Sequence, residues 1–174
     1  ARRRGVSPGA GGGGESPREG GPRGKREGTR EGLDAIVELD RQIGQIHFEQ
    51  APEVFCPPSS QQRAFLLDAI QREGRLFCVA VEEGLVVGFL IARIDINDSI
   101  PFLTKLPVCR ITTVVVDERH RSRGIGKELI AHCDDWAKAH DASQLKLEVM
   151  SFNARARSLY ESLGFKRPPG TSPK

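Results

Sequence analysis

Three arginines, two glycines and a lysine lie close together in residues 119–127, RHRSRGIGK. A glycine has no Cβ, so the backbone around it can approach a ligand closely. If a helix begins within this segment, its first N–H groups have no carbonyl partner and attract an anion. The basic side chains would add charge where phosphate oxygens lie. The residue types and their spacing therefore predict a phosphate site, and we expect a pyrophosphate.

The pattern of this segment, R-x-x-G-x-G, differs from two other phosphate motifs. It lacks the G-x-x-x-x-G-K-[ST] spacing of a P-loop and the G-x-G-x-x-G spacing of a dinucleotide-binding turn. Taken alone, it is also compatible with a charged, solvated turn. The flanking elements decide between these interpretations.

Three elements must hold the segment in place. Residues 108–118 are rich in β-branched side chains and predict a strand. Residues 124–141 place apolar side chains at spacings of three and four, as one face of a helix does. Residues 144–150 alternate apolar and polar side chains, which favours a half-buried strand. The segment therefore joins a strand to a helix within a βαβ unit.

The rest of the chain predicts two helices and a hairpin before that unit and one helix after it. We expect helices over 32–49 and from Ser59 to Gly74, strands over 75–82 and 85–96 joined by a tight turn, a short helix over 153–164 and a last strand beginning at Phe165. The expected order is therefore ααβββαβαβ.

The composition indicates one folded domain with polar ends. Residues 1–24 are mostly Gly, Arg, Pro and Ser, so we expect a disordered tail there, a folded domain over 25–168 and a second disordered tail over 169–174. Residues 1–32 have eight basic and four acidic side chains, which accounts for the net charge of +3. Because the remainder is nearly neutral, its charge argues against a nucleic-acid partner.

The cysteines and the apolar runs argue against two further classes of protein. The four cysteines form no C-x-x-C pair, so we expect buried, reduced thiols and no metal. The longest apolar run, near residues 85–92, is far shorter than the roughly 20 residues that cross a bilayer. No signal peptide is visible, and we therefore expect a cytoplasmic protein with no membrane partner.

With these elements in order, the chain resembles the GNAT superfamily of acetyl-CoA-dependent N-acetyltransferases. The resemblance covers about residues 33–166 and rests on VVVDERHRSRGIGKELI and on the block N-x-x-A-x-x-x-Y-x-x-L-G-F that begins at Asn153. It implies a fold of the α+β or α/β class: a mixed, mostly antiparallel sheet with a central splayed parallel pair, flanked by about four helices. It also implies acetyl-CoA as co-substrate and a primary amine of a small molecule or protein as acceptor.

The resemblance also assigns roles to residues. The glycine-rich segment would hold the pyrophosphate, and the preceding strand, with a bulge, would pair with pantetheine as an added strand does. An N–H of Val114 or Val116 would face the thioester oxygen. The implied cofactor-binding residues are Val114, Val115, Val116, Arg121, Ser122, Arg123, Gly124, Ile125, Gly126, Lys127 and Asn153.

The only tyrosine, Tyr160, matches the family's proton donor to the departing thiolate. A thiol has a pKa of about 8.5 and a phenol of about 10, so a close phenol can return a proton to the sulfur. Tyr160 also lies on a helical stripe with Ala156, Leu159 and Leu163, which suits a packing role. A phenol can do both, with its ring packed and its hydroxyl in a cleft.

The general base is less defined. Related sequences often have a carboxylate where this chain has Thr112 and Thr113. His47, near the end of the first helix, is a candidate base, and a packed histidine is the alternative. Glu148 is a weaker candidate, His120 suits a solvated loop, and proton loss through water is equally open.

Both ends depart from the family pattern. Residues 24–31 lack apolar alternation, and adjacent prolines follow Phe165, so the outer strands at both ends are doubtful. A homodimer could supply them. A non-catalytic acyl-CoA-binding protein of the same fold is the alternative function.

Overall fold

Five strands form one sheet in the computed structural model, which describes residues 24–27, 32–96, 100–102, 104–149 and 153–166. The elements are β1 (Gly24–Glu27), α1 (Leu33–Gln50), α2 (Gln61–Gln71), β2 (Arg75–Glu82), β3 (Leu85–Asp95), β4 (Val108–Val116), α3 (Ile125–Ala139), β5 (Gln144–Leu147) and α4 (Ala154–Ser162). A short 3-10 turn, Glu118–His120, lies between β4 and α3.

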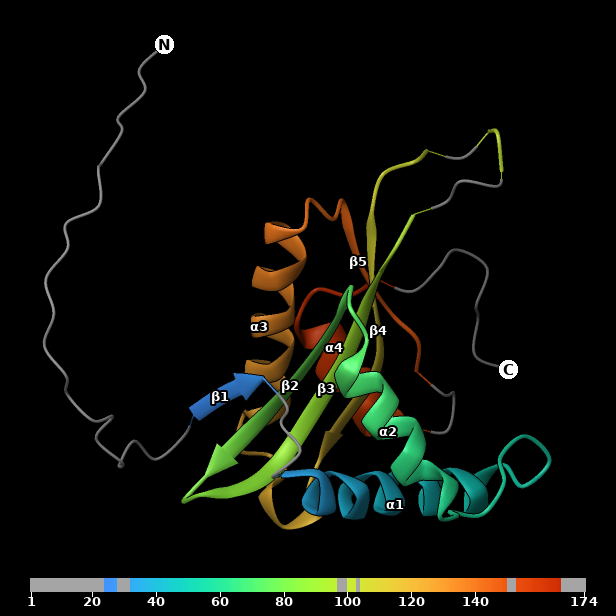
Figure 1. The fold of residues 1–174 in the computed structure, drawn as a ribbon, viewed down its shortest axis with the longest axis vertical. Coiled ribbons are helices and arrows are strands. Elements are labelled where there is room, and N and C mark those ends of the chain that lie inside the picture. The colour runs from blue at the N-terminus through green and yellow to red at the C-terminus, as the bar shows by residue number, and fades with distance from the viewer. Residues whose placement is uncertain (1–23, 28–31, 97–99, 103, 150–152, 167–174) are drawn as a thin grey trace, which may run out of the picture.

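The sheet order follows the chain, β1-β2-β3-β4-β5. The first three pairings are antiparallel, and only β4 and β5 run parallel, joined by α3 as the βαβ pattern predicts. In Figure 1, α1 and α2 cross the near face of the sheet, whereas α3 and α4 lie behind it. The predicted mixed, mostly antiparallel sheet with four helices is confirmed.

Each face of the sheet has its own core. The predicted apolar stripe of α3 buries Ile125, Leu129 and Cys133 against β2, β3 and β4, together with Tyr160 of α4. On the other face, Ile36 of α1 and Leu66 of α2 pack against the inward side chains of β2 and β3. Strand alternation therefore sorts the side chains of β2, β3 and β4 between a cofactor-side core, facing α3 and α4, and a helix-pair core, facing α1 and α2.

The predicted bulge lies in β4. Ile91 pairs with Thr113 and Ala92 with Ile111, so Thr112 is the extra residue. The Thr112 hydroxyl donates a hydrogen bond to the Ile91 carbonyl at 3.2 Å. The parallel pairing with β5 stops at Ile111 and Leu147, so β4 continues through Val116 beyond it. The parallel pair β4 and β5, at one edge of the described sheet, is therefore joined only along the first half of β4.

Gly88 brings β3 close to the second half of β4, where it pairs with Val116. A Cβ at residue 88 would lie 2.8 Å from the Val115 carbonyl oxygen and 3.4 Å from side-chain carbons of Ile125 and Leu129. Only glycine leaves room here for both the neighbouring strand and α3.

The first outer strand, doubtful from the sequence, is present but only four residues long. β1 pairs with β2 from Gly24↔Val81 to Glu27↔Cys78. Its ladder is made by main-chain groups, which need no apolar alternation.

The C-terminal side differs from the prediction. Phe165 does not begin a strand, because its N–H closes α4 by donating to the Tyr160 carbonyl at 3.1 Å. Gly164 has a φ of +89° and permits this closure. Residues 167–174, which include the tail expected over 169–174, lie outside the described residues. The strand expected over 144–150 ends at Leu147.

The cysteines follow the prediction for three of four thiols. Cys78, Cys109 and Cys133 are buried and form no disulfide bond, whereas Cys56 is exposed. The sulfur atoms of Cys109 and Cys133 lie 3.8 Å apart between β4 and α3. In the described part of the chain, no helix is long and apolar enough to span a bilayer, and no group of three or more His, Cys, Asp or Glu side chains could hold a metal.

Candidate active site

The glycine-rich segment lies between the end of β4 and the first turn of α3, as predicted. Gly124 is the N-cap of α3 and has a φ of +82°, and Ser122 has a φ of +62°. A Cβ added at Gly124 would meet no atom within 4 Å, so the backbone is open to solvent there. The first N–H groups of α3 begin at this corner, and the N-terminus of a helix favours a bound anion, so the position suits the phosphate that the sequence predicts.

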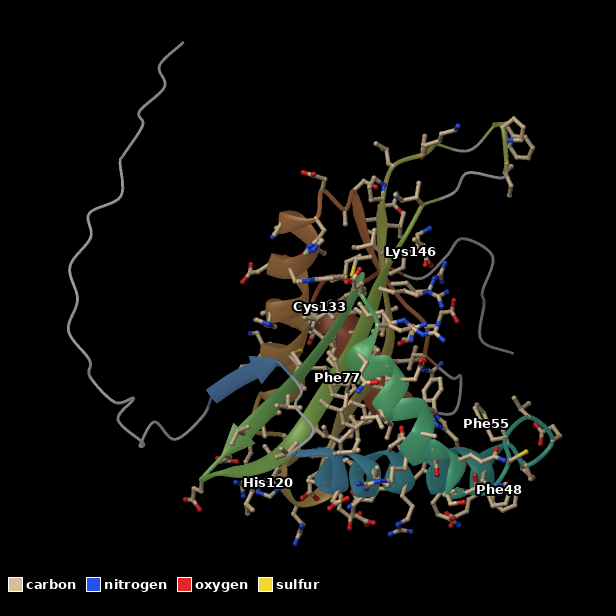
Figure 2. All side chains as sticks on the ribbon, viewed as in Figure 1. Phe48, Phe55, Phe77, His120, Cys133 and Lys146 are labelled. Atoms are coloured by element: carbon tan, nitrogen blue, oxygen red, sulfur yellow. The ribbon has the colours of Figure 1, made fainter. Side chains whose placement is uncertain are left out.

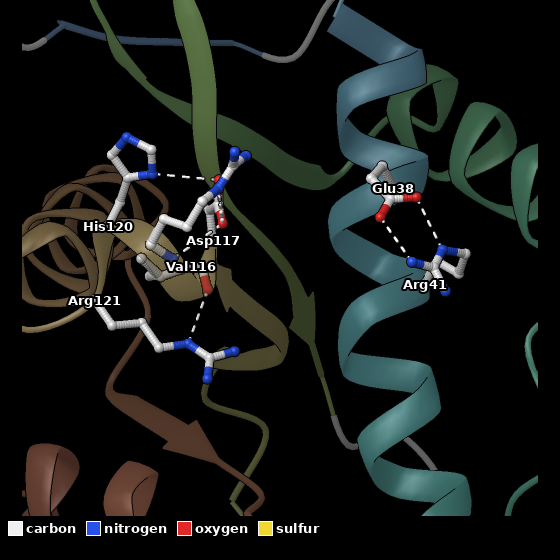
Figure 3. Close-up of polar contacts among 7 residues, drawn as sticks. Glu38, Arg41, Val116, Asp117, His120 and Arg121 are labelled. Atoms are coloured by element: carbon white, nitrogen blue, oxygen red, sulfur yellow. Dashed lines mark hydrogen bonds and ion pairs between the residues drawn. The ribbon is translucent and has the colours of Figure 1, made fainter.

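A buried carboxylate shapes this corner. Asp117 is 5% exposed and accepts hydrogen bonds from the Arg119 backbone N–H at 3.2 Å and the Arg119 guanidinium at 3.0 Å. His120 Nδ1 lies 3.2 Å from the same carboxylate (Figure 3). Burial raises the pKa of Asp117, but the hydrogen bonds from Arg119 and His120 outweigh it and lower that pKa overall. The 3-10 turn before the anion site is therefore built around one charged group.

The basic side chains of the segment have different partners. Arg121 Nε donates to the Val116 carbonyl at 3.2 Å, which ties the loop to the end of β4 (Figure 3). Arg123 lies 3.7 Å from the Glu82 carboxylate. Ser122 accepts a hydrogen bond from Arg155 of α4. Lys127 is exposed and lines the large cavity described next.

A cavity of about 1050 Å³ opens between α3, β5 and α4. Lys127 of α3 and Tyr160 of α4 both line it, together with Leu147 and Glu148 at the end of β5. Gly126 lets the two helices approach, since a Cβ there would lie 3.2 Å from a Leu159 methyl group. The cavity therefore joins the first turn of α3 to the tyrosine.

Tyr160 is packed and yet borders this cavity. Its side chain is 9% exposed and its ring meets Phe165 edge-on, with centroids 6.1 Å apart. Burial raises the pKa of the phenol. Among the described residues, its hydroxyl has no hydrogen-bond partner. Its environment therefore keeps the phenol protonated at neutral pH.

The remaining predicted cofactor residues are the three valines at the end of β4 and Asn153 at the start of α4. Val114 and Val116 pack toward the cofactor-side core and Val115 toward the helix-pair core. The Asn153 side chain accepts a hydrogen bond from the Ala156 N–H at 3.0 Å and so caps α4. In this structure, Asn153 thus positions the helix that bears Tyr160.

His47 lies apart from these groups. It is near the end of α1, half-buried, with its ring stacked on Phe55 at a centroid distance of 4.8 Å. Burial lowers its pKa. It lines neither of the two cavities described here.

Glu148, unlike His47, lines the cavities. It borders the large cavity and also a second cavity of about 350 Å³, which Arg93, Arg110 and Thr112 line as well. Arg110 donates to the Glu148 carboxylate at 2.6 Å. Figure 2 shows Lys146 near this end of the sheet, beyond the part that α1 and α2 cover. The sequence alone did not reveal this cluster, because it depends on which residues of β3, β4 and β5 lie opposite one another.

The family model for the Acetyltransferase (GNAT) family matches residues 41–165. The chain belongs to this family. The match includes every element from α1 to α4 except the first turns of α1, and it contains the glycine-rich segment and Tyr160.

Known proteins similar to this GNAT chain include enzymes with different acceptors in their names. It is 35% identical over 152 residues to N-alpha-acetyltransferase 40 of Saccharomyces cerevisiae, covering 80% of this chain and 53% of that protein. It is 36% identical over 93 residues to human N-acetylaspartate synthetase, covering 53% of this chain and 28% of that protein. The chain thus spans about half the length of the first relative and less of the second.

A solved structure shows the same fold. A mutant of the BH1408 protein from Bacillus halodurans superposes with a TM-score of 0.79 at 24% identity, covering 86% of this chain and 97% of that one. The GNAT fold of the chain is therefore confirmed both by sequence and by structure.

Proposed function

We propose that the chain is an N-acetyltransferase that moves an acetyl group from acetyl-CoA to a primary amine. The observation that supports this most directly is the cavity shared by the start of α3 and by Tyr160. Lys127 of the glycine-rich segment lines this cavity together with the phenol, and Leu147 and Glu148 lie beside them at the end of β5. The GNAT relatives are named for the same kind of reaction.

The residues present fit acetyl-CoA. Its pyrophosphate would lie at Gly124 and the first N–H groups of α3, with Lys127 and the arginines of the segment supplying positive charge. Its pantetheine arm would follow β4 past Ile111, where β5 no longer pairs with it. A main-chain N–H of Val114 or Val116 would then face the thioester oxygen. When bound, acetyl-CoA supplies an acetyl group activated as a thioester.

We propose Glu148 as the general base and Tyr160 as the general acid. Glu148 shares the cavity with Tyr160, whereas His47 lies outside it. An aliphatic ammonium group, with a pKa near 10, must lose a proton before it can attack, and a carboxylate can accept that proton directly or through water. The nitrogen then forms a bond to the acetyl carbon while the carbon–sulfur bond breaks. Tyr160 donates its proton to the sulfur and regains one, through solvent, from the acylated nitrogen.

Turnover of acetyl-CoA with a panel of amines tests this function. The panel should include amino acids, N-terminal peptides, polyamines and aminoglycosides, with release of the CoA thiol as the readout. We expect turnover with at least one amine and saturable binding of acetyl-CoA. Binding without turnover in the whole panel would instead favour a non-catalytic acyl-CoA-binding protein, and absence of binding would refute the assignment of the anion site.

A further inference from the structure

Three basic residues lie in one row across the sheet. Arg93 of β3 pairs directly with Arg110 of β4, which pairs directly with Lys146 of β5. Like charges at directly opposite positions destabilise a sheet. A row of three therefore needs a reason beyond folding.

The row faces the side of the sheet opposite to α3. Cys109 and Ile111, on either side of Arg110, pack in the cofactor-side core, so Arg110 points to the other face. Lys146 alternates with two leucines that pack against that core, and it lines the larger cavity rather than the smaller one. This end of the face extends beyond α1 and α2, and the cavity of about 350 Å³ opens there.

Two carboxylates offset the row only in part. Asp95 bridges Arg93 at 2.9 Å and Arg110 at 3.1 Å, and Glu148 pairs with Arg110 at 2.6 Å. Three cations against two carboxylates leave one positive charge. The Glu148 side chain is 82% exposed, so its pair with Arg110 is easily exchanged for another anion.

We infer that this cluster is the acceptor subsite and that it selects amines with a carboxylate close to the amino group. The inference rests on the proposed function. The acceptor carboxylate would bind Arg110 and Lys146 in place of Glu148, since guanidinium and ammonium groups both suit a carboxylate. Glu148, released from Arg110, would then face the acceptor ammonium group. One zwitterion would thus satisfy the positive row and free the proposed base at once.

The parting of β4 and β5 connects this subsite to the thioester. Arg110 and Glu148 line both cavities, and Tyr160 borders the larger one on the other side of the sheet. The acceptor would approach from the α1 and α2 face, and acetyl-CoA from the α3 and α4 face.

Binding of matched product analogues tests the subsite without requiring turnover. N-acetylglycine and its neutral amide should be titrated into the full chain saturated with CoA. We expect the acid to bind about tenfold more tightly than the amide, and Lys146→Gln to reduce this preference to less than threefold. Arg110→Gln should reduce it further. Arg72→Gln, which removes an exposed ion pair with Asp68 on α2, is the charge-matched control and should leave the preference unchanged.

Turnover gives an independent second readout. With the parent chain, glycine should be turned over with a higher kcat/KM than glycinamide. Lys146→Gln should reduce that difference, whereas Arg72→Gln should leave it unchanged. Equal binding of acid and amide by the parent chain would overturn the subsite even if amines are acetylated. A preference for the acid would support the subsite even if no amine in the panel is acetylated.

Discussion

Tyr160 combines packing and chemistry in a single side chain. Its ring belongs to the cofactor-side core, while its hydroxyl has no partner in the part of the chain that the structure describes. Its ring is therefore fixed by packing while its side chain borders the large cavity, an arrangement that suits the expected role as an acid.

Tyr160→Phe tests that role. We expect kcat to fall by about 100-fold, the lower end of the range for a lost general acid, with binding of acetyl-CoA unchanged. Burial raises the phenol pKa, so the acid of the parent chain stays protonated and its activity should show no loss from this group below about pH 10. A kcat within threefold of the parent, in a variant with an unchanged melting temperature, would leave Tyr160 a packing residue only.

The two candidate bases can be separated by paired variants. Glu148→Gln keeps the shape of the side chain but cannot accept a proton, and we expect kcat to fall by about 100-fold. His47→Gln should change kcat by less than threefold, because His47 stacks on Phe55 outside both cavities. The measurement is kcat at saturating acetyl-CoA. A large fall in kcat for His47→Gln together with a small change for Glu148→Gln would instead identify His47 as the base.

At the scale of elements, the corner between β4 and α3 depends on the left-handed backbone conformation of Gly124. Gly124 and Gly74 have φ values of +82° and +72°, and a Cβ at either would meet no atom within 4 Å. Backbone strain is thus the shared cost of replacing either glycine, whereas only Gly124 caps the helix of the anion site.

Gly124→Ala and Gly74→Ala form a matched pair. Both should lower the free energy of unfolding by about 1 kcal/mol, since an L-residue is strained in the left-handed region. Only Gly124→Ala should weaken acetyl-CoA binding, by at least fivefold, because relief of the strain moves the first N–H groups of α3. Denaturant unfolding and equilibrium titration provide the two measurements. Equal affinities for acetyl-CoA in the two variants would place the pyrophosphate elsewhere.

The elements that the sequence predicts well are those with strong periodicity. The apolar stripe from Ile125 to Ala137 predicted α3. The tight turn at Glu83 and Gly84 predicted the hairpin of β2 and β3, and both turn residues have a positive φ in the structure. The row of Arg93, Arg110 and Lys146 was not predictable, because it requires the register of three strands and the extra residue at Thr112. The role of Asp117 was also missed, although an aspartate before a turn is a known signal for a side-chain cap.

At the scale of the whole molecule, the charge of Asp117 links the stability of the fold to pH. Its hydrogen bonds lower its pKa despite burial, so the folded chain binds this proton less readily than the unfolded chain. Its stabilisation is therefore complete above the unfolded pKa of about 3.8 and is lost as the pH falls through the folded pKa.

Asp117→Asn should be less stable than the parent chain at pH 6, and the difference should shrink as the pH falls below about 3.8. Urea unfolding at pH 6, 4 and 3 measures it. Glu38→Gln is the control: the pKa of Glu38 is also lowered, by Arg41, but the pair is exposed and salt-screened, so little difference is expected at any pH (Figure 3). A constant difference between Asp117→Asn and the parent would mean that the neutral carboxyl serves equally well.

Each strand of the sheet lies next to its neighbour in the chain, and this has a consequence for how the protein comes together. The pairs β2–β3 and β3–β4 join segments that are close in the sequence, so we expect them to form fast. The parallel pair β4–β5 can form only after α3 has crossed the sheet, so we expect it to form later. The large cavity is bordered by α3, β5 and α4, the elements that we expect to pack last. We therefore expect β2, β3 and β4 to pair before the chain can bind a nucleotide. A bound nucleotide would then stabilise only the last step of folding, the packing of α3, β5 and α4.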